Sequence, residues 1–169
     1  MKILVDTREQ RPFTFSRFNV EIDRAALPTG DYSLPGFEDK VAIERKSLDD
    51  LVGCLKGENR ARFERELQRG RAYEFFCVAV EASLDDVSKG RYRSEMKAEA
   101  VLQSIVAFEV RYRVPFVWCV NRQGAEYMTH SFLSKYAREI EERSKMLTRG
   151  QAAKAPQKGI SNGQSDRDT

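Results

Sequence analysis

The sequence has little of several residue types on which common catalytic sites depend. Its 169 residues contain one histidine, His130, and three widely spaced cysteines, Cys54, Cys77 and Cys119. With a single histidine we expect neither a zinc site nor a Ser-His-Asp triad. Because the cysteines are odd in number and lie in apolar segments, we expect buried, reduced thiols and no disulfide framework.

Long apolar runs are also missing. Charged residues make up 33% of the chain, and no apolar stretch approaches the roughly 18 residues that span a bilayer. The amino-terminal sequence MKILVDTREQ has too short an apolar stretch for a signal peptide. We therefore expect a cytoplasmic protein that does not associate with a membrane.

The positive charge is concentrated at the end of the chain. Residues 144–169 contain five basic and two acidic residues, which accounts for the whole net charge of +3. Residues 1–143 are therefore neutral overall, and binding to nucleic acid there would need a local cluster of arginines. We predict a globular domain over residues 1–143 and a basic, disordered tail over residues 144–169, where hydrophobic periodicity is lost.

The stretch from Gly30 to Asp50 is predicted to form a hairpin of two strands followed by a helix. Pro35-Gly36 marks the turn, and residues 40–46 alternate in the manner of a second strand. Ser47 is a good helix N-cap with Asp50 at its third position. This order of elements brings several charged side chains close together.

Further elements follow from periodicity and from turn residues. We expect strands at residues 2–6, 20–22, 73–81 and 115–120, and helices at residues 48–57, 59–70, 94–112 and 125–143. Strands that alternate with helices after an early hairpin predict an α/β fold with a mixed central sheet covered by helices on both faces.

Four charged residues are candidates for a catalytic site. Glu44 and Lys46 are two apart on one strand and share one face of it, whereas Arg45 points to the opposite face. Asp31 lies at the mouth of the hairpin, and Asp6 ends the first strand. Carboxylates suit Mg²⁺, and a nearby lysine can stabilise charge on a phosphate. By itself this pattern is weak, and the alternative is an ion-pair cluster on the surface of a hairpin.

A longer pattern is more specific. The chain has V-D-x-R-E at residues 5–9, G-D at residues 30–31 and E-R-K-x-x-x-D at residues 44–50. Together these resemble the signature of the XPF-type structure-specific endonuclease family, and the resemblance covers roughly residues 2–140. It implies the restriction-endonuclease-like fold and cleavage of DNA near branch points with Mg²⁺ or Mn²⁺.

Transferred to this chain, the resemblance implies a role for each signature residue. Asp31, Glu44 and Asp6 would bind the metal, and Lys46 would be the catalytic lysine. The resemblance also implies residues that support the site, namely Arg8, Glu9, Arg45 and Asp50, and residues that contact DNA, namely Arg60, Arg62 and Arg65. The alternative for these last three is a solvated helix face with Glu–Arg pairs.

The resemblance leaves the target open. Related proteins carry helicase or helix-hairpin-helix domains that this sequence lacks, so we expect a stand-alone nuclease domain of a prokaryotic cell or of a phage in its host. We further expect a homodimer that acts on branched DNA, with an unidentified partner that supplies DNA targeting. The alternatives are a non-catalytic DNA-binding or scaffolding relative and a four-way junction resolvase.

Overall fold

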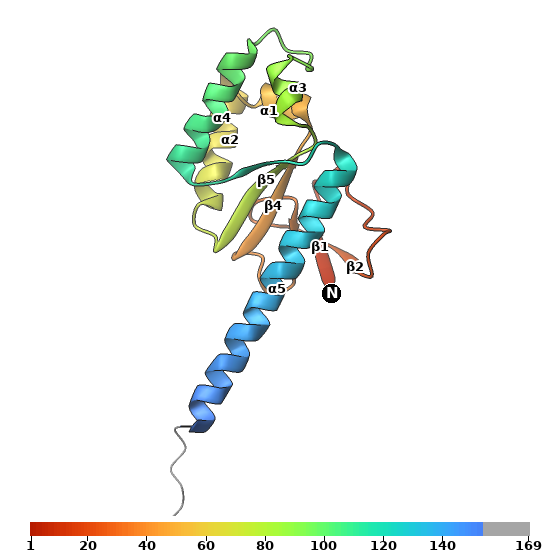
Figure 1. The fold of residues 1–169 in the computed structure, drawn as a ribbon, viewed down its shortest axis with the longest axis vertical. Coiled ribbons are helices and arrows are strands. Elements are labelled where there is room, and N and C mark those ends of the chain that lie inside the picture. Colours follow the sequence, from red (N-terminus) through yellow and green to blue (C-terminus); the bar gives the residue numbers. More distant parts are fainter. Residues whose placement is uncertain (154–169) are drawn as a thin grey trace, which may run out of the picture. The chain divides into compact units, whose positions relative to one another are not determined.

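The structure, a computed structural model, describes residues 1–153, and its strands form one six-stranded mixed sheet (Figure 1). The strands are β1 (Lys2–Asp6), β2 (Glu21–Ala25), β3 (Tyr32–Ser33), β4 (Val41–Lys46), β5 (Phe75–Val80) and β6 (Phe116–Trp118). The helices are α1 (Leu48–Gly53), α2 (Gly57–Gly70), α3 (Leu84–Ser88), α4 (Ala98–Tyr112) and α5 (Arg122–Ala153).

The order of strands in the sheet is β2-β1-β3-β4-β5-β6. The short strand β3 pairs antiparallel with β4, as the predicted hairpin requires. It also pairs antiparallel with β1. The pairs β1–β2, β4–β5 and β5–β6 are parallel. Strand β4 therefore lies inside the sheet, where both of its neighbours fix its position.

Two hydrophobic cores lie on opposite faces of this sheet. Alternation along β4 directs Ala42 into the core shared with α1, α2 and α4, and it directs Val41 and Ile43 into the core shared with α5. Segment 13–15, which contains two buried phenylalanines, also packs into this second core. The predicted α/β sheet with helices on both faces is confirmed, and Figure 1 shows the part of α5 up to Ala137 on the face away from α2 and α4.

The predicted start of the helix at residue 94 is wrong. Helix α4 begins at Ala98, because residues 94–97 use their polar groups in other ways. The hydroxyl of Ser94 accepts hydrogen bonds from Lys56 Nζ and from the amide of Met96, and the Tyr92 hydroxyl donates to the Met96 carbonyl. These contacts tie the segment to Lys56, the residue before α2, and leave it outside a helical turn.

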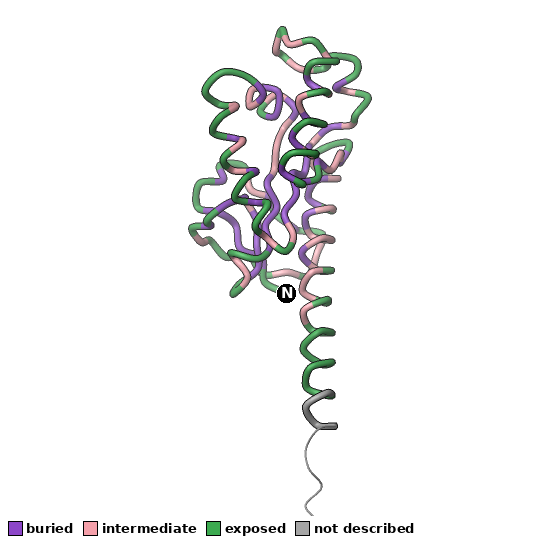
Figure 2. Tube along the Cα trace, turned by 90° about the vertical axis from the view of Figure 1, so that its left-hand side faces the viewer, coloured by how far each residue is buried: buried purple, intermediate pink, exposed green. Residues whose placement is uncertain are grey.

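The last helix is longer than predicted. Helix α5 continues past residue 143 to Ala153, ten residues into the predicted tail, and residues 154–169 lie outside the described part. Residues 138–149 contain no proline or glycine and are rich in Glu, Arg, Lys, Met and Leu, which favour a helix. Residues 141–149 are exposed (Figure 2).

The chain divides into two compact units, Met1–Ala137 and Arg138–Thr169. All predicted site residues belong to the first unit. None of the helices in residues 1–153 is both long enough and apolar enough to cross a membrane.

Candidate active site

Asp31 is held between β1 and β4 by its own backbone. Its amide donates to the carbonyl of Ile43 at 2.9 Å, and its carbonyl accepts from the amide of Asp6 at 2.8 Å. The preceding Gly30 has a φ of 77°, and a Cβ there would lie 2.8 Å from the Cβ of Ala42. Only glycine suits this position, because it adopts positive φ without strain and leaves room for β4.

The second carboxylate and the lysine come from β4. Glu44 is 4% exposed, and its Oε1 forms an ion pair with Nζ of Lys46, as expected for residues two apart on one strand. Nζ of Lys46 also lies 5.2 Å from the ring centroid of Phe63 on α2. Oδ2 of Asp31 accepts a 2.8 Å hydrogen bond from the amide of Arg45. Asp31, Glu44 and Lys46 therefore gather at one place, as predicted.

The electrostatics of this group are unusual. Burial raises the pKa of Asp31 to about 7, although the hydrogen bond from the Arg45 amide opposes the shift. Burial also raises the pKa of Glu44 well above its ordinary value, and the negative charge of Asp31 adds to the effect. Burial lowers the pKa of Lys46, but the charge of Glu44 outweighs it and the pKa is raised. A buried carboxylate, Glu44, and a half-buried one, Asp31, therefore lie near one ammonium group.

This donor set suits a hard divalent cation. Mg²⁺ is commonly held by one or two carboxylates, while water and substrate phosphate oxygens fill the other positions. A cation held by Asp31 and Glu44 would stabilise the charged carboxylates, which burial disfavours. Within residues 1–153, no group of three or more His, Cys, Asp and Glu side chains is arranged to hold a metal ion. The fit therefore rests on this pair of carboxylates.

Asp6, predicted as a further metal ligand, is fully hydrogen bonded. Oδ1 accepts from the amide and Nε of Arg8, each at 2.7 Å, and Oδ2 accepts from Nη2 of Arg8 and the amide of Leu27. Burial raises the pKa of Asp6, but the hydrogen bonds from Arg8 outweigh it and lower the pKa. Asp6 lines one cleft together with Asp31, Glu44 and Lys46. To bind a metal there, Asp6 would have to release one of these hydrogen-bond donors.

Two of the predicted supporting residues, Arg45 and Asp50, contact different parts of the structure. Arg45 points away from Glu44 and Lys46, as predicted, and its Nε lies 2.9 Å from Oε2 of Glu9. Asp50 accepts a hydrogen bond from the Ser47 hydroxyl at 2.6 Å, and its amide donates to the same hydroxyl. Ser47 thus caps α1, and the Asp50 carboxylate, which holds the Ser47 hydroxyl, also lines the cleft. Glu81, which the sequence reasoning missed, forms a second ion pair with Arg45.

A cleft of about 640 Å³ surrounds the predicted catalytic group. It is lined by residues of the signature and of α2, among them Asp6, Arg8, Asp31, Glu44, Lys46, Asp50, Arg62, Phe63, Glu66 and Arg69. The cleft thus joins the hairpin, the end of β1 and one face of α2. Its walls carry both the acidic pair and arginine side chains, which suits a phosphate ester beside a metal ion.

The arginines of α2 divide between the cleft and the rest of the surface. Arg62 is exposed and lines the cleft, together with Arg69, which the sequence reasoning did not select. Arg60 instead contacts the Phe108 ring at 4.7 Å and pairs with Glu64, so it anchors α2 to α4. Arg65 is exposed and lies outside the residues that line the cleft. Residues seven apart share a helix face, which is the signal that would have selected Arg69.

Comparisons with known proteins agree with this arrangement. A family profile described as the ERCC4 domain matches residues 5–132. The DNA repair endonuclease XPF of Cricetulus griseus is 28% identical over 126 residues, which is 69% of this chain and 13% of that protein. The chain therefore spans about an eighth of the length of this relative.

Solved structures show the same fold. XPF from Aeropyrum pernix matches with a TM-score of 0.65 and 21% identity, covering 86% of this chain and 70% of that one. The same protein in complex with DNA matches with a TM-score of 0.63 and 22% identity, covering 82% of this chain and 66% of that one. The predicted restriction-endonuclease-like sheet is thus confirmed as a fold.

Proposed function

The chain belongs to the ERCC4 domain family, and on that premise we propose that it is a metal-dependent DNA endonuclease that cuts branched, flapped or forked DNA. The observation that carries the proposal is the meeting of Asp31, Glu44 and Lys46 in one cleft, where a half-buried and a buried carboxylate lie beside a lysine. The DNA-bound structure of a protein with this fold supports DNA as the substrate.

Asp31 and Glu44 would hold Mg²⁺ or Mn²⁺, and the bound ion would supply an activated water and neutralise charge on the phosphate. Lys46 remains an ammonium group, because the charge of Glu44 raises its pKa, and it is placed to stabilise negative charge that develops on the phosphate oxygens. Arg62 and Arg69 on the wall of the cleft would contact neighbouring phosphates without reading the bases.

We also propose that the protein forms a homodimer and that a partner directs it to DNA structures. Val106 and Val110 lie one turn apart on α4 and are 50% and 77% exposed. An exposed apolar pair on a helix is suited to a contact with a second copy. Light scattering tests this proposal, and a monomeric mass at high protein concentration would contradict it.

A cleavage panel tests the proposed activity. The wild type is incubated with Mg²⁺ or Mn²⁺ and with flap, fork, nicked, four-way, single-stranded and plain duplex DNA. We expect cleavage of branched substrates, and a loss of about 10²–10³-fold in Asp31→Asn, Glu44→Gln and Lys46→Met. Asp39→Asn is a matched control, since Asp39 lies in the turn of the same hairpin and is exposed.

The same panel separates the other candidate functions. If the protein binds DNA but cuts none of the substrates, it is instead a non-catalytic DNA-binding or scaffolding relative. A strong preference for four-way DNA would identify a junction resolvase with the same chemistry. Cleavage that survives all three substitutions would disprove the assignment of the site.

A further inference from the structure

Four side chains of alternating charge form a chain of ion pairs behind the candidate site. Arg45 Nε lies 2.9 Å from Oε2 of Glu9, and Arg45 Nη1 lies 3.2 Å from Oε1 of Glu81. Oε1 of Glu81 also accepts a 2.7 Å hydrogen bond from Nη1 of Arg122, in the first turn of α5. Only Arg45 and Glu9 of these four belong to the sequence signature.

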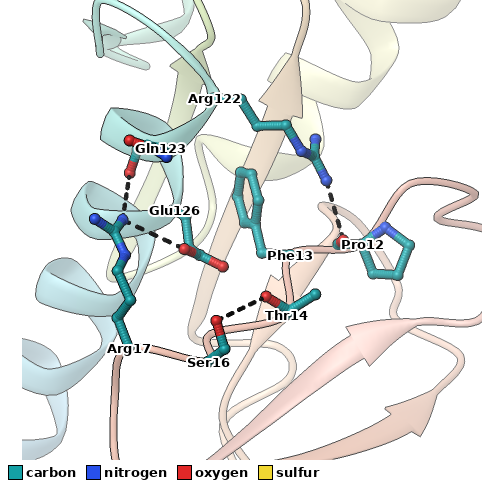
Figure 3. Close-up of a pocket in the computed structure, with 8 residues that line it drawn as sticks. All are labelled: Pro12, Phe13, Thr14, Ser16, Arg17, Arg122, Gln123 and Glu126. Carbon is teal, nitrogen blue, oxygen red and sulfur yellow. Dashed lines mark hydrogen bonds and ion pairs between the residues drawn. The ribbon is translucent and has the colours of Figure 1, made fainter.

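The chain of ion pairs is closed into a ring by the polypeptide itself. Nη2 of Arg122 donates to the carbonyls of Arg11 at 2.6 Å and Pro12 at 3.0 Å, and its guanidinium lies 4.8 Å from the Phe13 ring centroid. Arg11, Pro12 and Phe13 follow Glu9 after one intervening residue. The loop after β1 is therefore held by Arg45 at Glu9 and by Arg122 at Arg11 and Pro12. Figure 3 shows Arg122 pointing toward Pro12 beside the ring of Phe13.

The ring of ion pairs is buried at Arg45, its member on β4. The side chain of Arg45 is 9% exposed, and those of Glu9 and Glu81 are 4% and 9% exposed. Charges removed from water in this way depend on their partners, because an unpaired buried charge is costly. The Arg45 side chain therefore has little freedom to leave its position.

The opposite side of Arg45 faces the candidate site through its backbone. The Arg45 amide donates to Oδ2 of Asp31, and Arg45 stands between Glu44 and Lys46 on the same strand. A shift of the Arg45 side chain would thus move one hydrogen bond of Asp31 and the two flanking residues together. The ring and the candidate site share this one residue.

From this geometry we infer that Glu81 and Arg122 are positioning residues, which align Asp31, Glu44 and Lys46 by fixing Arg45 from the opposite face of the sheet. The inference concerns the site described under the proposed function and rests on that function for its effect on cleavage. Neither residue touches the cleft. Partners that orient the residues of a site typically change its activity by about 10–100-fold when they are replaced.

Two measurements on Glu81→Gln and Arg122→Met test the inference. The first is the hydrogen-exchange rate of the Arg45 amide, measured by NMR, which reports its bond to Asp31 without any need for cleavage. We expect this rate to rise about 10-fold in both variants. The second is steady-state cleavage, in which we expect kcat to fall about 10-fold or more while KM for DNA stays within about twofold.

A matched control variant is Arg17→Met. Arg17 lines the same surface pocket as Arg122, and it contacts Glu126 and the Gln123 carbonyl (Figure 3). We expect neither the exchange rate nor kcat to change in this variant. Arg122→Lys keeps the charge, so its exchange rate and its kcat should both lie closer to the wild-type values than those of Arg122→Met.

The double variant Glu81→Gln/Arg122→Met gives a further check. If both residues act through Arg45, its loss of kcat should be close to that of Glu81→Gln alone. Unchanged exchange of the Arg45 amide in both single variants would overturn the inference, whether or not the wild type cuts DNA. A wild type that fails to cut, with faster exchange in the variants, would overturn the proposed function and leave the positioning role supported.

Discussion

The amide of Arg45 donates a 2.8 Å hydrogen bond to Oδ2 of Asp31. This contact joins the second and third parts of the sequence signature, G-D and E-R-K-x-x-x-D, which are separated by the turn of the hairpin. Because Arg45 is flanked by Glu44 and Lys46, the bond sets the distance of Asp31 from the other two groups. The first acidic residue is thus located by the backbone of the strand that carries the second one.

Divalent cations should stabilise the wild type through this pair. At a concentration of Mn²⁺ about 100-fold above its Kd, the free energy of unfolding should rise by about 2.7 kcal/mol. Asp31→Asn should lose most of this gain, while Asp39→Asn should keep it. Thermal unfolding with and without Mn²⁺, and after removal of the metal by EDTA, measures the effect. An equal gain in the wild type and in Asp31→Asn would contradict the assignment of Asp31 as a ligand.

Gly30→Ala should destabilise the fold and displace Asp31. The substitution combines a positive φ with a Cβ placed 2.8 Å from the Cβ of Ala42. We expect a loss of about 3 kcal/mol in urea unfolding, from backbone strain and overpacking together. Gly36→Ala is the control, since Gly36 has a φ of 80° but no atom within 4 Å of an added Cβ. Equal losses in both variants would show that the contact with Ala42 is unimportant.

The buried pair of Glu9 and Arg45 should make stability depend on pH. Burial raises the pKa of Glu9, but hydrogen bonds from Arg45 and from the Arg11 amide outweigh it and hold the pKa below its ordinary value of 4.5. Because the folded pKa is the lower one, the stabilisation is present above pH 4.5 and is lost as the pH falls through the folded pKa.

Glu9→Gln tests this dependence. We expect a loss of about 3 kcal/mol at pH 7, because one partner of a buried ion pair is removed. The difference from the wild type should shrink as the pH is lowered below 4.5 in a series of urea titrations. Glu95→Gln, at an exposed position, should change stability by less than about 0.5 kcal/mol at every pH. A difference that is independent of pH would contradict the role of the Glu9 charge.

The arginines of α2 should differ in their contribution to DNA binding. Arg62→Ala and Arg69→Ala should each reduce the slope of log K against log salt by about 0.9, because each removes one phosphate contact in the cleft. Arg65→Ala, on the same helix but outside the cleft lining, should leave the slope unchanged. Binding is measured by fluorescence anisotropy in EDTA, without cleavage. If Arg65→Ala reduces the slope more than Arg62→Ala and Arg69→Ala do, the DNA contacts another face of α2.

Much of this molecule follows from sequence patterns that act over short distances. The pairing of Glu44 with Lys46, the opposite direction of Arg45 and the cap formed by Ser47 and Asp50 all depend on residues close in sequence. Strand alternation and helix capping are local rules, so they are readable without a structure. The periodicity of apolar residues likewise predicted both faces of the sheet.

Other features depend on contacts between distant segments. Local helix signals placed a start at Ser94, but the hydroxyl of Ser94 is bonded to Lys56, 38 residues earlier. No pattern within the sequence indicates that Glu81 meets both Arg45 and Arg122, because three separate segments bring them together.

The sequence by itself determined the residues of the candidate site and the sheet that carries them. Only the tertiary structure decided that Asp6 has both oxygens occupied by Arg8 and Leu27, and that Arg60 faces Phe108 instead of the cleft. The reason is physical: residue type and spacing fix which chemistry a side chain can perform. The packing of segments far apart in the chain fixes which partners it finds.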